Sequence, residues 1–186
     1  MIEMRQPNGG FVILAAAWDE ILRSLPDVQD LVRISARLLT ALGIGACIGL
    51  QREMTHHSAG LRTHMLVALG TALLIVSASE SGMDTGDVSR IIQGVVTGIG
   101  FLGGGAILKL THEKEIHGLT TAAGIWMTAA AGAAAGLGRI GTAIIGTIFT
   151  LLVLGALRKF EKRLGRRALK DSADQPGSVG AGRVDP

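Results

Sequence analysis

The chain has 186 residues, of which 48% are hydrophobic, 18% charged and 3% aromatic, and its mean hydropathy is +0.43. This composition excludes a disordered chain, the single cysteine excludes an internal disulfide framework, and a net charge of only +3 argues against nucleic-acid binding. Glycine fills 27 positions, about twice its usual ~7% share, so the whole is typical of a polytopic membrane protein.

Residues 1–30 are predicted to form a leader with an amphipathic helix. Apolar residues recur there at helical spacing, at Phe11, Leu14, Trp18, Ile21 or Leu22, and Leu25. Charged residues fall between them, and Pro26 ends the pattern. Such a helix is expected to lie in the membrane interface. A signal peptide with a short apolar core at 11–17 is the alternative, although Glu3 does not suit its basic start; another kind of leader also stays open.

Five transmembrane helices are predicted over residues 31–157, near 31–50, 63–80, 90–108, 119–137 and 139–157. Four of them contain uncharged runs, at 63–79, 91–108, 118–138 and 140–157. Each run is close to the ~20 residues that cross ~30 Å of hydrocarbon. The run at 38–51 is shorter and becomes long enough if Arg33 and Arg37 extend their charged ends to the interface. The predicted fold class is therefore all-α, a bundle of about five transmembrane helices.

Lys and Arg gather on one side of this predicted bundle. Eleven of them lie in the loops 51–62 and 109–118 and in the segment 158–170. The other side has five, Arg23, Arg33, Arg37, Arg90 and Arg139, together with the acidic loop 80–87. The positive-inside rule then predicts an outside N-terminus and a cytoplasmic C-terminus in the bacterial inner membrane. The basic segment is expected to lie against lipid headgroups, and the rest of 158–186 to be a disordered cytoplasmic tail.

Glycine pairs spaced four residues apart mark faces of three predicted helices. The pairs are Gly45 and Gly49, Gly94 and Gly98, Gly100 and Gly104, and Gly132 and Gly136. Without side chains at these positions, helix backbones can approach closely in a membrane. Packing within the bundle explains such faces, and because there are more of them than five helices need, a homodimer is also expected.

Two segments carry a family resemblance. They are Ile-Gly-Leu-Gln-Arg-Glu at 48–53 and Ala-Gly-Leu-Arg-Thr-His-Met-Leu-Val at 59–67. Together with 90–103 and 118–128, in the same order, they resemble the MgtC/SapB family of membrane proteins over about residues 31–157. The resemblance implies an inner-membrane protein of about five helices. Some members are linked to growth in low magnesium, to virulence through survival inside macrophages, and to restraint of ATP synthase.

The sequence departs from the family in two ways. Gln51 stands where the family usually has Glu, and no soluble C-terminal domain like that of the longer virulence members is predicted. Functions that depend on that domain are not expected to carry over.

The family segments bring polar residues to the predicted cytoplasmic ends of the helices. Helix N-termini offer free amides and a positive partial charge, which suit an anion or an acidic partner. Thr120 and Thr121 are expected to cap one helix, and Glu53 to pair with Arg52 or Arg62. Two interpretations stay open: the cluster anchors and caps helices, or it binds an ion, a headgroup or a partner protein. Its members are Arg52, Glu53, Arg62, Thr63, His64, Thr120 and Thr121.

Histidines fall on the same predicted side, at His56, His57, His64, His112 and His117, beside Glu53, Glu113 and Glu115. Imidazoles and carboxylates could bind a transition metal, but none of their spacings matches a familiar zinc motif. Solvated loop residues are the favoured interpretation. No cofactor is predicted, magnesium binding stays open, and no metal ligand is assigned.

Two functional classes compete for this sequence. A path for magnesium usually needs carboxylates that face the bundle interior, and no Asp or Glu falls within the four long runs. The sequence therefore favours a non-enzymatic regulator that contacts other membrane proteins. A magnesium or other ion path lined by hydroxyls such as Thr97, Thr121 and Thr128 is the alternative. An enzyme is not expected, because no catalytic triad, phosphate loop or paired acids occur.

Overall fold

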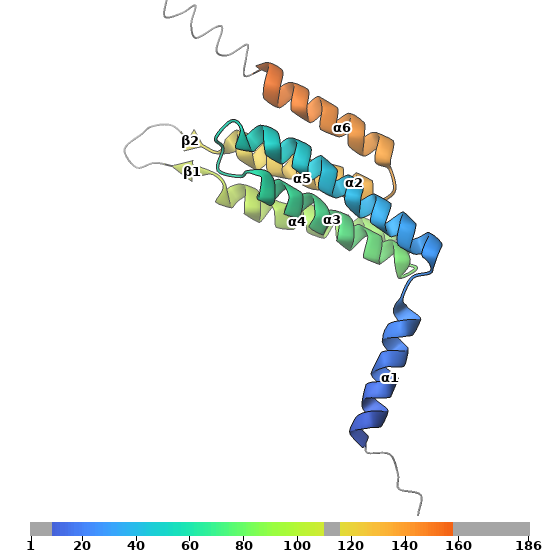
Figure 1. Cartoon of the computed structure of the whole chain (residues 1–186). Coiled ribbons are helices and arrows are strands. Elements are labelled where there is room, and N and C mark those ends of the chain that lie inside the picture. The colour runs from blue at the N-terminus through green and yellow to red at the C-terminus, as the bar shows by residue number, and fades with distance from the viewer. Residues whose placement is uncertain (1–8, 110–115, 158–186) are drawn as a thin grey trace, which may run out of the picture. The chain divides into compact units, whose positions relative to one another are not determined.

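The computed structural model describes residues 9–109 and 116–157, and nearly all of them are helical. The helices are α1 (Gly9–Ser24), α2 (Val28–Glu53), α3 (Leu61–Glu80), α4 (Thr85–Gly105), α5 (Leu119–Gly136) and α6 (Ile140–Leu152), followed by a π-helical segment, η1 (Val153–Leu157) (Figure 1). The strands β1 (Leu108–Lys109) and β2 (Ile116–His117) pair antiparallel. The all-α prediction is confirmed, and the helices from α2 to η1 cover the five predicted spans. The predicted tail 158–186 and His112, Glu113 and Glu115 lie outside the described residues.

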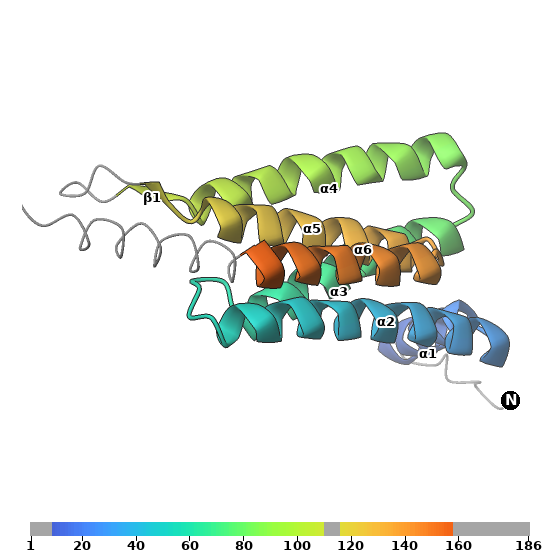
Figure 2. The ribbon, with the colours of Figure 1, turned by 90° about the horizontal axis from the view of Figure 1, so that it is seen from above.

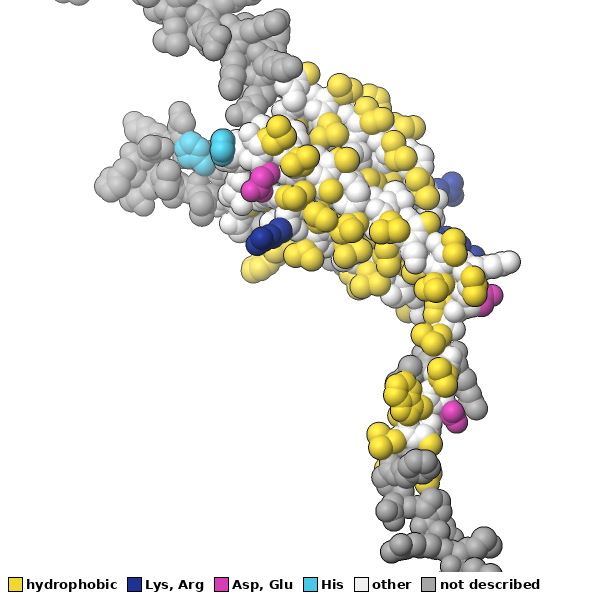
Figure 3. Space-filling model, viewed as in Figure 1, with side chains coloured by type: hydrophobic (Ala, Val, Ile, Leu, Met, Phe, Trp, Pro, Cys, Tyr) yellow, Lys and Arg dark blue, Asp and Glu magenta, His cyan; other side chains and the backbone are white. Residues whose placement is uncertain are grey.

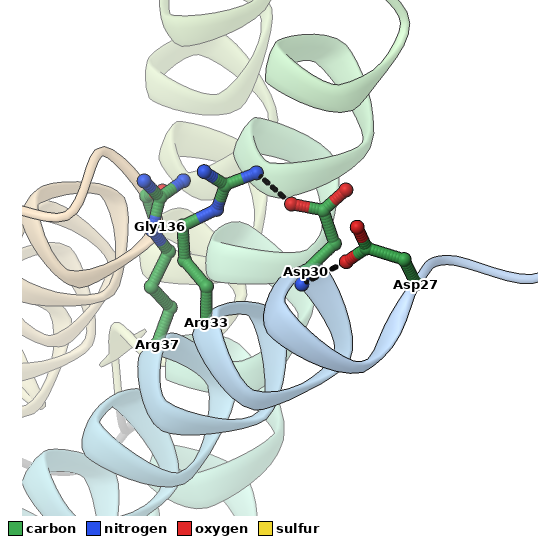
Figure 4. A network of polar contacts seen from close by, with 5 residues as sticks. All are labelled: Asp27, Asp30, Arg33, Arg37 and Gly136. Carbon is green, nitrogen blue, oxygen red and sulfur yellow. Dashed lines mark hydrogen bonds and ion pairs between the residues drawn. The ribbon is translucent and has the colours of Figure 1, made fainter.

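The chain divides into two units, Met1–Ala36 and Arg37–Pro186. In the first unit, α1 forms where the apolar repeat predicted a helix, and its place in the membrane interface stays a prediction. Asp27 caps the start of α2, because its Oδ1 accepts a hydrogen bond of 2.8 Å from the Asp30 amide (Figure 4). Asp30 in turn forms an ion pair with Arg33 one turn later.

In the second unit the helices run back and forth beside one another (Figure 2). The α2–α3 loop, the two strands and η1 lie at one end, which we call the β-ladder end (Figure 1). The α3–α4 and α5–α6 connections lie at the other end. α5 packs against α3, α4 and α6. The loops predicted on one side of a membrane thus share one end of the bundle.

Close helix packing depends on four of the predicted glycines. An ideal Cβ at Gly45 would lie 2.6 Å from the carbonyl oxygen of His64, and one at Gly49 would lie 2.8 Å from the Leu61 Cα. On α5, a Cβ at Gly132 would lie 2.5 Å from the Ala68 oxygen, and one at Gly136 2.8 Å from the Ala72 oxygen. The backbones of α2 and α5 therefore rest directly on α3, with a core of mainly small residues: Ala41, Ile44, Ile48, Ala68, Ala72, Ala131, Ala135 and Ala143.

The glycine pairs of α4 have a different environment. Around Gly94, Gly98, Gly100 and Gly104, no described atom outside the glycine's immediate surroundings lies within 4 Å of an ideal Cβ. These four glycines therefore do not bring α4 against another described helix. Their role in packing stays a prediction.

At the end opposite the β-ladder, the guanidinium of Arg37 meets the C-terminus of α5. Nη1 donates a hydrogen bond of 3.2 Å to the carbonyl oxygen of Gly136 (Figure 4). Gly138 follows with a φ of +75°, and a Cβ there would lie 3.1 Å from Nη2 of the same guanidinium. The side chain expected only to reach the interface thus binds the negative end of a helix dipole.

The outer surface of the bundle is apolar. Phe101 is 85% exposed, and many other large apolar side chains of α2–α6 are exposed as well. In Figure 3, hydrophobic side chains cover the middle of the helices, and charged and histidine side chains lie toward their ends. By length and composition, α2 and α3 are each able to cross a membrane, and Ile140–Ala156 is a shorter apolar helix. These features are those of a helical membrane protein.

Candidate functional site

Arg52 is the first component of the site. It lies in the last turn of α2 and only 1% of it is exposed. Its Nη2 donates a hydrogen bond of 3.2 Å to the Thr121 hydroxyl in the first turn of α5. The sequence predicted this residue at the polar end of a helix, and the structure instead buries its charge between helices.

His64 is also buried, with 0% exposed, in the first turn of α3. Its Nδ1 lies 2.7 Å from the Thr128 hydroxyl oxygen on α5. Thr128 donates its own hydrogen, over 2.8 Å, to the carbonyl oxygen of Gly124. The hydroxyl must then accept from His64, which assigns the ring hydrogen to Nδ1. The other nitrogen, Nε2, is buried and has no hydrogen-bond partner among the described residues.

Gly124 brings these two side chains together. An ideal Cβ at this position would lie 3.5 Å from Cε1 of His64 and 3.9 Å from Nε of Arg52. We call Arg52, His64, Thr121 and Thr128 the buried polar row. The sequence indicated three of its members but missed the pairing of His64 with Thr128. The spacing of Thr121, Gly124 and Thr128, which share a face of one helix, is the signal that could have found it.

Glu53, the neighbour of Arg52, has a separate role. Its Oε2 accepts a hydrogen bond of 3.0 Å from the amide of Leu61, the first residue of α3. Gly60 precedes that helix, and a Cβ there would collide with Oε2 of Glu53. The sequence predicted Glu53 as the counter-ion of an arginine; the structure gives it the role of a cap for a helix N-terminus.

Arg62 and Thr63 lie outside the buried polar row. Both are exposed, and Arg62 forms no hydrogen bond or ion pair with the described residues. With Glu53, Gly60 and Leu61 they line a cavity of about 470 Å³. The single cluster expected from the sequence is therefore two groups, one buried and one at the surface.

A larger cavity opens at the start of α5. It has a volume of about 520 Å³, and we call it the α5 pocket; its lining residues are His56, His57, Ser58, Ala106, His117, Gly118, Leu119, Thr120 and Thr121. The helix begins after Gly118, whose φ is +96° and at which a Cβ would collide with the Ala106 carbonyl oxygen. No side chain caps this helix, so the predicted capping by threonine is wrong. The capping residue, Gly118, instead has a left-handed backbone conformation, which only glycine readily adopts.

The described histidines do not form a metal site. Within residues 9–109 and 116–157, no three side chains of His, Cys, Asp or Glu form a group that could hold an ion. His56, His57 and His117 share the α5 pocket, whereas His64 belongs to the buried polar row.

The whole buried polar row and both cavities lie within a segment that matches a known family. Residues 38–163 match the profile of the MgtC family. This chain belongs to the MgtC family. Protein SrpB of Synechococcus elongatus is 42% identical over 144 residues, which cover 72% of this chain and 79% of SrpB.

Two further relatives are similar to this chain over less of their own length. The putative magnesium transporter YhiD of Escherichia coli strain K12 is 42% identical over 134 residues, 68% of this chain and 61% of YhiD. Protein MgtC of Brucella abortus is 39% identical over 148 residues, 80% of this chain and 61% of MgtC. The chain thus spans about three-fifths of the length of these two relatives. No solved structure matches it.

Proposed function

We propose that this MgtC-family protein is a non-enzymatic regulator in the bacterial inner membrane. It serves adaptation to low magnesium and virulence through survival inside host cells. It acts through contacts with other membrane proteins. It crosses the membrane several times, with its N-terminus outside and the β-ladder end in the cytoplasm. The observation that carries this proposal is the buried positive charge of Arg52 at that end.

A buried cation is unfavourable for the passage of another cation. Like charges repel strongly where the local dielectric is low. Among the described residues, the buried polar side chains are Arg52, His64, Thr71, Thr121, Thr128, Thr147 and Thr150. Magnesium favours carboxylates and retained water, and this set offers it hydroxyls, an imidazole and a repelling guanidinium. The β-ladder end is better suited to attract an anionic group.

The same end offers surfaces to which a partner can bind. The α5 pocket and the cavity beside Arg62 both open there and are lined by polar side chains. An acidic segment of another membrane protein would find the exposed guanidinium of Arg62. Membrane lipids cover the apolar surface between the two ends.

The protein is further proposed to form a homodimer. Support comes from the α4 pairs Gly94 with Gly98 and Gly100 with Gly104, which no described helix approaches closely. Glycine faces of this spacing allow helices of two copies to meet at short range.

Transport of magnesium or another ion is the second candidate. Similarity to the putative magnesium transporter YhiD favours it, as do the hydroxyls of Thr121 and Thr128 within the buried polar row. The regulator remains the better candidate because an ion path through this row would have to pass Arg52.

Magnesium flux into liposomes tests the proposal. The purified chain is reconstituted into liposomes that enclose a magnesium-sensitive dye. Magnesium uptake is followed with and without a membrane potential. If the protein is a regulator, liposomes that contain the wild type or Arg52→Gln should take up no more magnesium than liposomes without protein. Uptake above that background, increased in Arg52→Gln because the repelling charge is removed, would establish transport instead.

Growth of a deletion strain in low magnesium gives the complementary measurement. Wild-type protein should restore growth, and Arg52→Gln should not restore it at matched membrane abundance. Rescue by a variant without the buried charge would remove the main support for the proposal.

A further inference from the structure

The hydroxyl of Thr121 differs from those of three other buried threonines on α5 and α6. Thr128, Thr147 and Thr150 each donate to the carbonyl oxygen four residues earlier in their own helix. The residue four positions before Thr121 is His117, which lies in β2 before α5 begins. Thr121 accepts a hydrogen bond from Arg52, and its own hydrogen has no acceptor in the part of the chain that the structure describes. This side chain is 3% exposed and lines the α5 pocket. A buried donor therefore belongs to a residue in the wall of a cavity.

The backbone supplies further donors at the same place. The first amides of a helix lack acceptors within it, and here Gly118 caps α5 without a side chain. The first helical hydrogen bond is made by the Ala122 amide to the Gly118 carbonyl oxygen. The amides of Leu119, Thr120 and Thr121 come before it, and all three residues line the pocket. The positive end of the helix dipole thus points at this cavity.

The described lining of the α5 pocket carries no acidic side chain. It contains three histidines, one serine and two threonines. The guanidinium of Arg52 lies next to this lining, because its Nη2 is 3.2 Å from the hydroxyl oxygen of Thr121. Donors, a helix N-terminus and a buried cation together favour an oxyanion over a cation or an uncharged ligand.

We propose that the α5 pocket binds a phosphate group. The Thr121 hydroxyl and the first amides of α5 donate to its oxygens, and Arg52 provides the compensating charge through Thr121. The phosphate is either free or part of a lipid headgroup, and the volume of about 520 Å³ leaves room for the group that carries it. The inference rests on the proposed function, because it names a ligand for the β-ladder end, where that function is placed.

Binding is measured on the full chain in a maltoside detergent, which contains no phosphate. Inorganic phosphate and a short-chain phosphatidic acid are titrated separately by calorimetry, and each is then added as competitor to the other. Saturable, mutually competitive binding is expected. Tighter binding of phosphatidic acid would assign the pocket to a headgroup, and tighter binding of inorganic phosphate would assign it to the free ion. Saturable binding of neither probe would overturn the inference.

Four variants decide whether the pocket is responsible. Thr121→Val removes the donor while keeping the shape, and should weaken binding roughly tenfold, the value of one charge-assisted hydrogen bond. Thr121→Ser should retain binding. Thr147→Val is the matched control, because it removes a buried hydroxyl that does not line the pocket. Thr120→Asp places a carboxylate at the helix N-terminus, where it stabilises the helix but occupies the phosphate site, so binding should be lost without loss of folding.

Two results would contradict the inference. One is equal weakening by Thr121→Val and Thr147→Val, and the other is unchanged binding in Thr120→Asp. Complementation in low magnesium separates this inference from the proposed function. If the pocket variants lose phosphate binding but restore full growth, the inferred phosphate site stands and the function placed there is refuted. If the wild type does not bind phosphate but Arg52→Gln fails to restore growth, the phosphate site is refuted and the proposed function stands.

Discussion

Nη2 of Arg52 donates a hydrogen bond of 3.2 Å to the hydroxyl of Thr121, and both side chains are buried. The bond joins the last turn of α2 to the first turn of α5, two segments 69 residues apart in sequence. A guanidinium inside an apolar bundle requires such acceptors, since burying a charge without partners costs several kcal/mol. This contact fixes how the two helix ends meet at the β-ladder end.

The first prediction compares two arginines. Arg52→Lys should reduce growth in low magnesium and lower the melting temperature, because an ammonium group cannot reproduce the planar set of guanidinium donors. Arg62→Lys should keep the fold intact, because Arg62 is exposed and bonds to no described residue. Thermal unfolding in detergent and complementation at matched abundance measure both effects. Equal stability of the two variants would show that the buried contact contributes nothing to the fold.

The second prediction concerns His64 and Thr128. Thr128→Val should destabilise the protein by about 1–3 kcal/mol, because it leaves a second ring nitrogen of a buried imidazole without a partner. Thr128→Ser keeps the hydroxyl and should cost much less. Thr147→Val serves as control, since Thr147 bonds only within its own helix. Unfolding free energies from denaturant titration give the comparison, and a loss shared by Thr128→Val and Thr147→Val would contradict it.

The sequence predicted the helices well because their signals are local. Uncharged runs end at charged residues, and α3, α4 and α5 begin and end within a few residues of the predicted bounds. The predicted glycines at Gly45, Gly49, Gly132 and Gly136 also pack as helix-face spacing implies, because that spacing follows from the helix itself.

The arrangement of the polar residues was harder to predict. Arg52 and Glu53 are adjacent, yet the first turns inward to Thr121 and the second caps α3 at the surface. Which neighbour turns inward depends on how α2 is rotated against α3 and α5, and no local pattern encodes that rotation. The partner of His64 likewise lies 64 residues away, at Thr128.

The third prediction tests the cap on α3. Glu53→Ala should cost about 0.5–2 kcal/mol, because the Leu61 amide loses its acceptor at a helix N-terminus. Glu53→Gln should cost less, since its amide oxygen still accepts that bond while the charge is lost. Melting temperatures of the two variants, recorded in low and high salt, check this order. A larger loss for Glu53→Gln than for Glu53→Ala would exclude the capping role.

The fourth prediction separates folding from association. Gly45→Leu should reduce stability by about 1–3 kcal/mol or more, because even a Cβ there would lie 2.6 Å from the His64 carbonyl oxygen. Gly98→Leu should fold normally, because no described atom lies near its ideal Cβ, and should weaken only the proposed homodimer. Thermal unfolding reports the first effect, and native mass measurement from lipid reports the second. A wild type found only as monomer would exclude the dimer.

The fifth prediction is the orientation of the β-ladder end. Ser58 lies in the α2–α3 loop at that end, and Asp84 caps α4 at the opposite end. Cysteines introduced as Ser58→Cys and Asp84→Cys, in a Cys47→Ser background, should react with a membrane-impermeant thiol reagent from opposite sides. In intact spheroplasts Asp84→Cys should be labelled, and Ser58→Cys only after the membrane is opened, because the basic loops are expected in the cytoplasm.

An impermeant quencher added first to spheroplasts controls for leakage of the thiol reagent. Labelling of both cysteines from the outside would refute the arrangement of spans, whereas the reverse pattern would keep the spans and invert the protein in the membrane.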